Sequence, residues 1–281
     1  MSGIRNLAGF TLLAVAATLA SASARQSESR APATAVLTVE QMEAFLLKAK
    51  IVRMRPTGVG VTNSQRVTLT DGELTHDAHV QVIDEYKSSF STPQYSEVGF
   101  RDTYVYNVAA YRLAQLLGLD NVPVSVVRDT RLGRGSFTWW VDDVMMDETE
   151  RRKRGVDDPD IARRNHYTHR MRVFDELIQN RDRNQGNILF TSEWKMWLID
   201  HTRAFRLMRQ LLNPAVLTRI ERPLFERLQG LTPEALTKAL DPHLGRSGRE
   251  DLLARRNLLV AHFRARIAEL GEDRVLYTFD R

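Results

Sequence analysis

The spacing of hydrophobic positions divides the chain into two unlike parts. In the first part, short apolar runs alternate with polar turns, which is typical of β-strands. The pattern predicts strands at 58–69 (a pair joined by a polar turn), 78–83, 122–128 and 136–146. One helix is expected among them at 103–117, because its apolar side chains recur at helical spacing and Gly118 follows.

Helical spacing dominates the second part of the chain. A long helix is predicted to end near Asn180, after a charged, proline-containing segment at 149–160. Two short strands should follow at 187–190 and 196–199, and the remainder should be helical. A β-rich part followed by a helical part is an α+β chain in two lobes, which we place at 38–147 and 148–281.

Polar side chains at three positions mark helix starts. Thr38 with Gln41 and Ser247 with Glu250 have the spacing of capping boxes, and Thr232 precedes Pro233. We therefore expect helices to begin at these positions.

The N-terminus has the pattern of an export signal. A basic residue, an apolar stretch and the cleavage pattern Ala22-Ser23-Ala24 follow one another in residues 1–24. An uncleaved anchor helix is the alternative, but the stretch is shorter than the ~20 residues that span a bilayer. We expect a cleaved signal peptide, a linker at 25–37, and an exported (periplasmic or secreted) protein without stable membrane insertion.

Composition excludes several classes of site. The chain has no cysteine, so disulfides, thiolate chemistry and cysteine-bound zinc are excluded. The net charge of +5 arises from interspersed charges. The basic run at 151–154 has no aromatic residues within it, so we expect a solvated helix end or loop and no nucleic-acid partner.

Three polar side chains in the segment 180–205 carry the chemical signal. Asp182 follows the long predicted helix, Asn187 begins one strand and Asp200 ends the next. A hairpin turn at 192–193 joins these strands and should bring Asp200 back toward Asn187. Carboxylate and amide oxygens are ligands that Mg²⁺ prefers, usually together with substrate phosphates. The segment therefore predicts a magnesium site.

The same residue types also occur in ordinary loops. Asp and Asn cap helices and form turns, so Asp182 and Asn187 alone would not distinguish a site from a turn. Asp200 is the deciding residue, because the apolar run 197–199 precedes it. A carboxylate behind such a run is costly to bury unless it is paired or binds a metal.

In the order and spacing of Asp182, Asn187 and Asp200, the segment resembles the protein-kinase-like superfamily. In that superfamily an Asn follows the catalytic-loop Asp by five residues, and a later strand supplies a metal-binding Asp. Asn180-Arg181 stands where His-Arg is usual, and Asp200-His201-Thr202 stands where Asp-Phe-Gly is usual. This form is more similar to atypical branches such as phosphatidylinositol 3- and 4-kinases and secretory-pathway kinases. The resemblance implies a two-lobed kinase-like fold with a β-rich N-lobe, one αC-type helix and a helical C-lobe.

The resemblance also implies a nucleotide site in the first lobe. The loop that covers the phosphates would include Gly58, Gly60, Thr62 and Ser64. A plain hairpin explains these four residues equally well. The hinge that binds adenine would lie at Met145 and its two successors.

Two residues depart from the family pattern. Gln81 stands where the third strand normally carries a phosphate-binding lysine, and Asn107 stands where the αC helix carries that lysine's glutamate partner. A pair of neutral amides leaves no orphan charge, but it should bind phosphate less strongly. A charge-assisted hydrogen bond contributes ~1.5–3 kcal/mol, against ~0.5–1.5 kcal/mol for a neutral one.

Other side chains near the segment are less specific. Arg181 and Arg183 flank Asp182, so we expect them to keep it ionised and to lower its basicity. Arg203 and Arg206 could hold a phosphate or pair with Asp182, and a solvated surface position explains Arg206 equally well. Trp139-Trp140 is more typical of packing than of substrate stacking, and His166 with His169 lacks a third metal ligand.

Three functions remain open from the sequence. The leading one is an ATP-dependent phosphotransferase in which Asp182 orients the acceptor hydroxyl and accepts its proton, while Asn187 and Asp200 hold Mg²⁺ or Mn²⁺. A nucleotide-binding pseudokinase is the first alternative, favoured by Gln81 and Asn107. A nucleotidyl transferase on the same fold is the second. The sequence does not indicate the acceptor.

Overall fold

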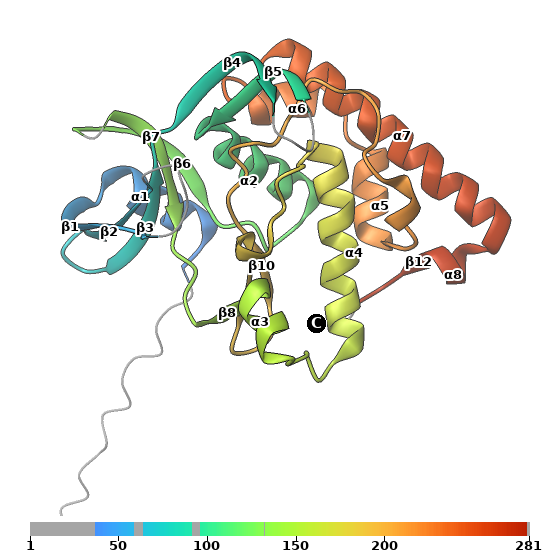
Figure 1. Ribbon diagram of the computed structural model, residues 1–281, viewed down its shortest axis with the longest axis horizontal. Coiled ribbons are helices and arrows are strands. Elements are labelled where there is room, and N and C mark those ends of the chain that lie inside the picture. The colour runs from blue at the N-terminus through green and yellow to red at the C-terminus, as the bar shows by residue number, and fades with distance from the viewer. Residues whose placement is uncertain (1–36, 59–63, 92–95, 132, 280–281) are drawn as a thin grey trace, which may run out of the picture. The chain divides into compact units, whose positions relative to one another are not determined.

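A five-stranded antiparallel sheet forms much of the first half of the molecule in the computed structural model (Figure 1). The structure describes residues 37–58, 64–91, 96–131 and 133–279, and residues 37–281 form one compact unit. The sheet order is β1-β2-β3-β7-β6, where the strands are β1 (Lys50–Pro56), β2 (Gln65–Thr70), β3 (Thr75–Gln81), β6 (Ser125–Thr130) and β7 (Gly133–Trp139). The expected signal peptide, and Gly60 and Thr62 of the expected loop, lie outside the described residues.

Two helices pack on strands β6 and β7 of this sheet. Helix α1 (Val39–Lys48) begins with the expected capping box, in which Thr38 and Gln41 each bond the other's backbone N–H. Helix α2 (Val105–Leu117) ends at Gly118, whose left-handed backbone (φ 65°) suits a residue without a Cβ. The sheet face between the helices is apolar, and Phe137 and Val126 are buried there.

A hairpin between β3 and α2 was not predicted. Strands β4 (Asp84–Ser91) and β5 (Ser96–Thr103) pair only with each other among the described strands. Most β4 side chains are exposed, so the strand lacks the alternation of apolar and polar residues on which strand prediction depends. The Phe90 and Phe100 rings, stacked at 4.4 Å, provide apolar contact within the hairpin.

The single strand expected at 136–146 is two strands in different sheets. The first is β7, and the second is β8 (Val144–Asp147), which pairs with β9 (Ile188–Thr191). Strand β10 (Met196–Leu198) completes this second sheet, in the order β10-β9-β8. The chain therefore passes from the first sheet to the second between Trp139 and Val144. The expected pair at 58–69 was also misplaced at its start, because its first strand is β1.

Helices make up most of the second half and lie to the right of the sheet in Figure 1. Asp147 caps α3 at the start of the charged segment 149–160, because its carboxylate accepts the N–H of Glu150. The helices are α3 (Glu148–Arg154), α4 (Ile161–Ile178), α5 (Arg222–Gln229), α6 (Pro233–Leu240), α7 (Arg246–Leu270) and α8 (Glu272–Val275), with 3₁₀ turns η1 (Gln185–Asn187) and η2 (Pro214–Val216) and the short strands β11 (Ile220–Glu221) and β12 (Leu276–Tyr277).

The predicted start of α6 is confirmed, whereas the predicted start of α7 is wrong. Thr232 caps α6 as expected, since its hydroxyl accepts the N–H of Ala235. The capping box at Ser247 was wrong: Gly245 is the N-cap of α7, without a side-chain bond, and Ser247 is already helical.

A fully buried arginine connects α7 to the end of α4 and to the segment that follows β10. Arg255 donates to the carbonyl oxygens of Leu177 (2.7 Å), Arg206 (3.3 Å) and Met208. Burial lowers the pKa of its guanidinium to about 10, and the neighbouring carboxylates of Asp251 and Glu176 oppose that effect.

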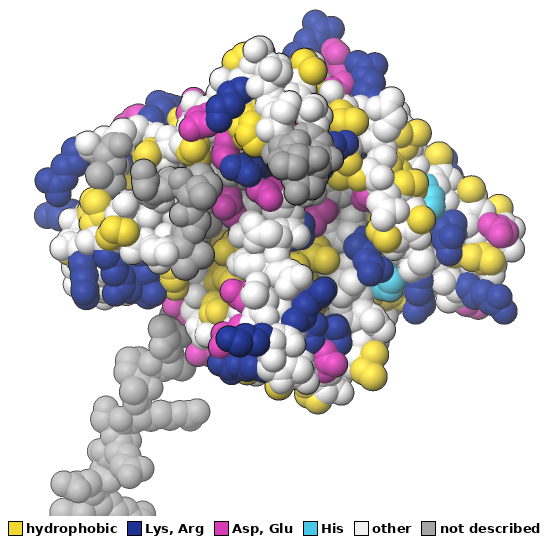
Figure 2. Space-filling model, viewed as in Figure 1, with side chains coloured by type: hydrophobic (Ala, Val, Ile, Leu, Met, Phe, Trp, Pro, Cys, Tyr) yellow, Lys and Arg dark blue, Asp and Glu magenta, His cyan; other side chains and the backbone are white. Residues whose placement is uncertain are grey.

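Charges are interspersed on the surface. Figure 2 shows Lys and Arg side chains over several parts of one face, with Asp and Glu among them. None of the described helices is long and apolar enough to cross a membrane.

Candidate active site

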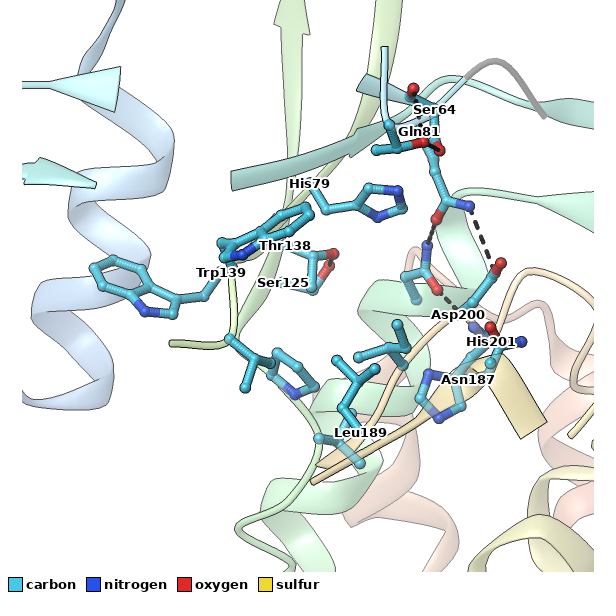
Figure 3. Close-up of a pocket in the computed structure, with 18 of the residues that line it drawn as sticks. Ser64, His79, Gln81, Ser125, Thr138, Trp139, Asn187, Leu189, Asp200 and His201 are labelled. Carbon is cyan, nitrogen blue, oxygen red and sulfur yellow. Dashed lines mark hydrogen bonds between the residues drawn. The ribbon is translucent and has the colours of Figure 1, made fainter. Parts of the chain in front are cut away.

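A cavity of about 340 Å³ lies between the first sheet and the second (Figure 3). Its lining comes from β3, α2, β6, β7, the connection after β7, and the segment from η1 to His201. Val122, Val144, Leu189 and Ile199 give it apolar walls. Polar groups gather at one end, where Figure 3 shows Gln81, Asp200, Asn187 and His201 close together.

The cavity gathers some of the expected site residues and leaves others outside. Ser64, Gln81, Asn187 and Asp200 line it, but Gly58, Met145 and Asp182 are not among its lining residues. Met145 is 36% exposed, whereas its neighbour Val144 lines the cavity.

The connection between the two sheets lies directly before the segment in which the hinge is expected. Trp139, Trp140 and Val141 line the cavity directly after β7. Trp139 also packs, since its ring stacks on His76 at 3.8 Å and meets Phe45 edge-on. A single expected strand through this region hid the connection.

Two neutral amides replace an ion pair at the polar end of the cavity. The Asn107 amide Nδ2 donates to Oε1 of Gln81 at 2.6 Å, which confirms the expected pairing of β3 with the αC-type helix. The Asn107 Oδ1 accepts the backbone N–H of His201 at 2.8 Å. Both amides are buried, so each satisfied bond avoids a desolvation cost of ~1–3 kcal/mol.

Asp200 ends the second strand of the hairpin with its carboxylate facing this pair. Its Oδ1 accepts bonds from the Thr202 hydroxyl (3.1 Å), the Thr202 N–H (3.4 Å) and the Gln81 Nε2 (3.5 Å). In the described part of the chain these donors all reach Oδ1, which leaves Oδ2 available to a cation. The residue has a left-handed backbone, with φ 51°.

Asn187 lies at the same end of the cavity as Asp200 (Figure 3). Its carbonyl accepts the N–H of Ile199 at 3.1 Å, which extends the β9–β10 hairpin and holds the two site residues together. One carboxylate and one amide oxygen fit Mg²⁺ or Mn²⁺, which complete their coordination with water and phosphate. The described residues contain no cluster of three or more His, Cys, Asp or Glu side chains able to hold a metal ion.

Asp182 lies in the loop after α4, beside the cavity. Asn180 holds the loop by accepting the Asp182 N–H at 3.1 Å, and Arg203 Nη1 donates to Asp182 Oδ2 at 3.3 Å. Burial raises the pKa of the Asp182 carboxyl, the charge of Arg203 opposes that rise, and the charge of Asp200 adds to it.

The expectation that Arg181 and Arg183 keep Asp182 ionised was wrong. Arg183 pairs with Asp175 of α4 at 2.9 Å and donates to the Ile199 carbonyl at 2.8 Å. Arg181 Nη2 contacts the Met208 sulfur at 3.3 Å. Sequence neighbours therefore point away from Asp182, and the more distant Arg203 supplies its cation.

His79 was missed by the sequence analysis although it lines the cavity. It lies two residues before Gln81 on β3, so both side chains are on one face of the strand, and that spacing was the available signal. Burial lowers the pKa of the His79 imidazole, while the charge of Asp200 opposes the shift. The described residues that line the cavity include no lysine or arginine.

No protein-family model matches the sequence, and no curated protein does. Solved structures do match. The hydra Fam20 structure with sugar has a TM-score of 0.65 at 14% identity, covering 86% of this chain and 93% of that one. The Golgi casein kinase with Mn/ADP bound has a TM-score of 0.62 at 14% identity, covering 86% and 80%. The Helicobacter pylori proinflammatory kinase CtkA has a TM-score of 0.54 at 13% identity, covering 80% and 98%.

These likenesses extend over most of each chain. In this chain the αC-type helix α2 follows β3 and the β4–β5 hairpin, and Asn187 and Asp200 flank the β9–β10 hairpin. The chain therefore has the two-lobed protein-kinase-like fold, with secretory-pathway kinases among its structural neighbours.

Proposed function

We propose that this protein is an ATP-dependent phosphotransferase with lobes at 38–147 and 148–281. The observation that carries the proposal is that Asn187 and Asp200 share one cavity while Asp182 lies in the loop beside it. A Golgi casein kinase of the same fold is recorded with Mn/ADP bound, which supports a nucleotide and a divalent metal as cofactors. The acceptor is a hydroxyl-bearing molecule of unknown class.

The residues divide the work between binding and proton transfer. The apolar walls of the cavity would enclose adenine, and Asp200 with Asn187 would hold Mg²⁺ or Mn²⁺ at the polar end. The bound metal would neutralise charge on the β- and γ-phosphates. Asp182 would orient the acceptor hydroxyl and accept its proton, a role that the raised pKa of its carboxyl favours.

A nucleotide-binding pseudokinase is the second candidate, because of the Gln81–Asn107 pair. Without a cation at position 81, the protein contributes less to phosphate binding than a lysine would. A nucleotidyl transferase on the same fold remains the third candidate, since it would use the same metal-binding residues with the nucleotide reversed.

One experiment separates the three candidates. The mature protein is incubated with Mg²⁺ or Mn²⁺ and ATP labelled on either the γ- or the α-phosphate, together with candidate acceptors. Transfer of γ-label, lost in Asp200→Asn, supports the phosphotransferase. Transfer of α-label would replace it with nucleotidyl transfer, and nucleotide binding without transfer of either label would leave a pseudokinase.

We further propose that the protein acts after export. The signal-peptide pattern at 1–24 supports this, as does the presence of secretory-pathway kinases among proteins of similar fold. N-terminal sequencing of the mature protein should start at Arg25. A mature protein that keeps Met1 would refute the proposal.

A further inference from the structure

A backbone hydrogen bond and two ion pairs connect the β4–β5 hairpin to the segment that follows Asp200. The Thr103 N–H donates to the Thr202 carbonyl at 2.9 Å, and two ion pairs flank this bond. Arg203 pairs with Asp102 at 2.7 Å and Arg206 with Glu97 at 3.1 Å. An inserted element of the first half thus contacts the segment nearest the candidate metal ligand.

Arg203 joins this hairpin to Asp182. Its Nε donates to Asp102 Oδ2, while its Nη1 donates to Asp182 Oδ2 at 3.3 Å. The Asp102 side chain is only 3% exposed, and its other oxygen, Oδ1, is buried without a hydrogen-bond partner among the described residues. A buried carboxylate is costly unless it is paired, so losing the ion pair with Arg203 would destabilise Asp102. The pair therefore holds the Arg203 guanidinium in place.

The two carboxylates that Arg203 contacts differ in how exposed they are to solvent. The Asp182 side chain is 43% exposed and could turn toward water, whereas Asp102 cannot. Neither arginine next to Asp182 in sequence restrains it, since Arg183 pairs with Asp175 and Arg181 contacts Met208. The orientation of Asp182 therefore depends on Arg203, and the orientation of Arg203 depends on Asp102.

We propose that Arg203, held by Asp102, is a positioning residue that orients Asp182 for proton transfer and makes transfer depend on the docking of the β4–β5 hairpin. This inference rests on the phosphotransferase function proposed above. The hairpin forms its own two-stranded sheet, so it can shift without breaking the ladder of the five-stranded sheet. A partner that displaced the hairpin would draw Arg203 away from Asp182 and leave the nucleotide cavity intact.

The test variant removes both charges of the buried pair. Arg203→Gln alone would leave Asp102 buried and unpaired and could unfold the protein, so Asp102→Asn/Arg203→Gln is used with it. We expect the double variant to fold and to bind Mg–ATP within about twofold of the unsubstituted protein. Its kcat should fall on the order of 100-fold, because a misplaced catalytic group costs about that much.

A pH profile supplies a readout that a purely structural role would not change. Among the influences on Asp182, the charge of Arg203 lowers the pKa of the carboxyl more than that of Asp102 raises it. Its removal should therefore shift the acidic limb of kcat to higher pH. The conservative variant Arg203→Lys keeps the charge but not the fork of two donors. Its acidic limb should therefore lie closer to that of the unsubstituted protein, whereas its kcat should recover to a smaller extent.

The matched control is Glu97→Gln/Arg206→Gln. It removes the second ion pair between the same two segments and leaves the Asp102–Arg203–Asp182 contacts in place. Because the charge of Arg206 also lowers the pKa of Asp182, this control is compared by its kcat at a pH above the acidic limb. An equal loss of kcat in this control, or an unchanged kcat and pH profile in the test variant, would overturn the inference. Absence of γ-transfer by the unsubstituted protein would instead reject the proposed function, so the two failures are distinguishable.

Discussion

Restoring the ion pair at the polar end of the cavity tests whether Gln81 faces the nucleotide phosphates. In Gln81→Lys the introduced ammonium would meet the Nδ2 donor of Asn107, because Asn107 Oδ1 already accepts from His201. Nδ2 then loses its 2.6 Å acceptor and keeps only the longer bond to Ser136, while the ammonium can pair with Asp200, so the loss is one net hydrogen bond of about 0.5–1.5 kcal/mol. The single variant should be less stable by about that amount.

Adding Asn107→Glu should remove this conflict. One oxygen of the introduced carboxylate can accept from the His201 N–H and the other can pair with the ammonium. The Ser136 hydroxyl, which accepts from Asn107 at 3.3 Å, can rotate and donate. The phosphate then gains a charge-assisted bond in place of a neutral one, a difference of about 1–1.5 kcal/mol, or roughly five- to tenfold in Kd.

The assay is calorimetric titration of Mg–ATP into each variant, beside urea unfolding. Thr75→Lys is the control, since it adds the same charge at the exposed start of β3 and should leave Kd unchanged. If the double variant is folded and binds no more tightly than the unsubstituted protein, Gln81 does not face the phosphates. If the single variant is as stable as the unsubstituted protein, the description of the hydrogen bonds is wrong.

Three further predictions follow from the site and the core. Asp200→Asn should weaken Mg–ATP binding, because the metal loses its carboxylate, whereas Asp182→Asn should retain binding and lose transfer; equal binding losses in calorimetry would reject this division. The kcat should fall as pH decreases through the pKa of Asp182, which burial raises above its usual 3.8, so a kcat unchanged below pH 4 would contradict its role as a base. Arg255→Met should lower the free energy of unfolding by about 3 kcal/mol, since it strands buried carbonyl oxygens; an unchanged urea midpoint would refute this.

The sequence predicted best where local chemistry decides structure. The capping box of α1, the cap of α6 and the glycine that ends α2 were all placed correctly, because each depends on residues a few positions apart. The hairpin that places Asn187 and Asp200 in one cavity was also predictable, since both residues lie within one short stretch of chain.

Tertiary contacts explain what the sequence could not predict. The break between β7 and β8 depends on which sheet each strand joins, and although Asp142-Asp143 interrupt the run at 136–146, two polar residues do not show that the strands on either side join different sheets. The cation beside Asp182 was expected to come from the adjacent Arg181 and Arg183. In the structure Arg183 pairs with Asp175, and Arg203, which is 21 positions away in the sequence, pairs with Asp182. That His79 lines the cavity depends on residues far along the chain that line it with β3, which the local sequence pattern does not show.

The left-handed backbone of Asp200 limits how this site can change during evolution. Most side chains are strained at φ 51°, whereas Gly adopts it freely and Asn and Asp tolerate it better than other residues. A relative that lost its metal ligand by one substitution would therefore be expected to carry Asn or Gly at this position and to keep its fold. Alanine there would combine backbone strain with the loss of charge, so natural inactive members should rarely show it.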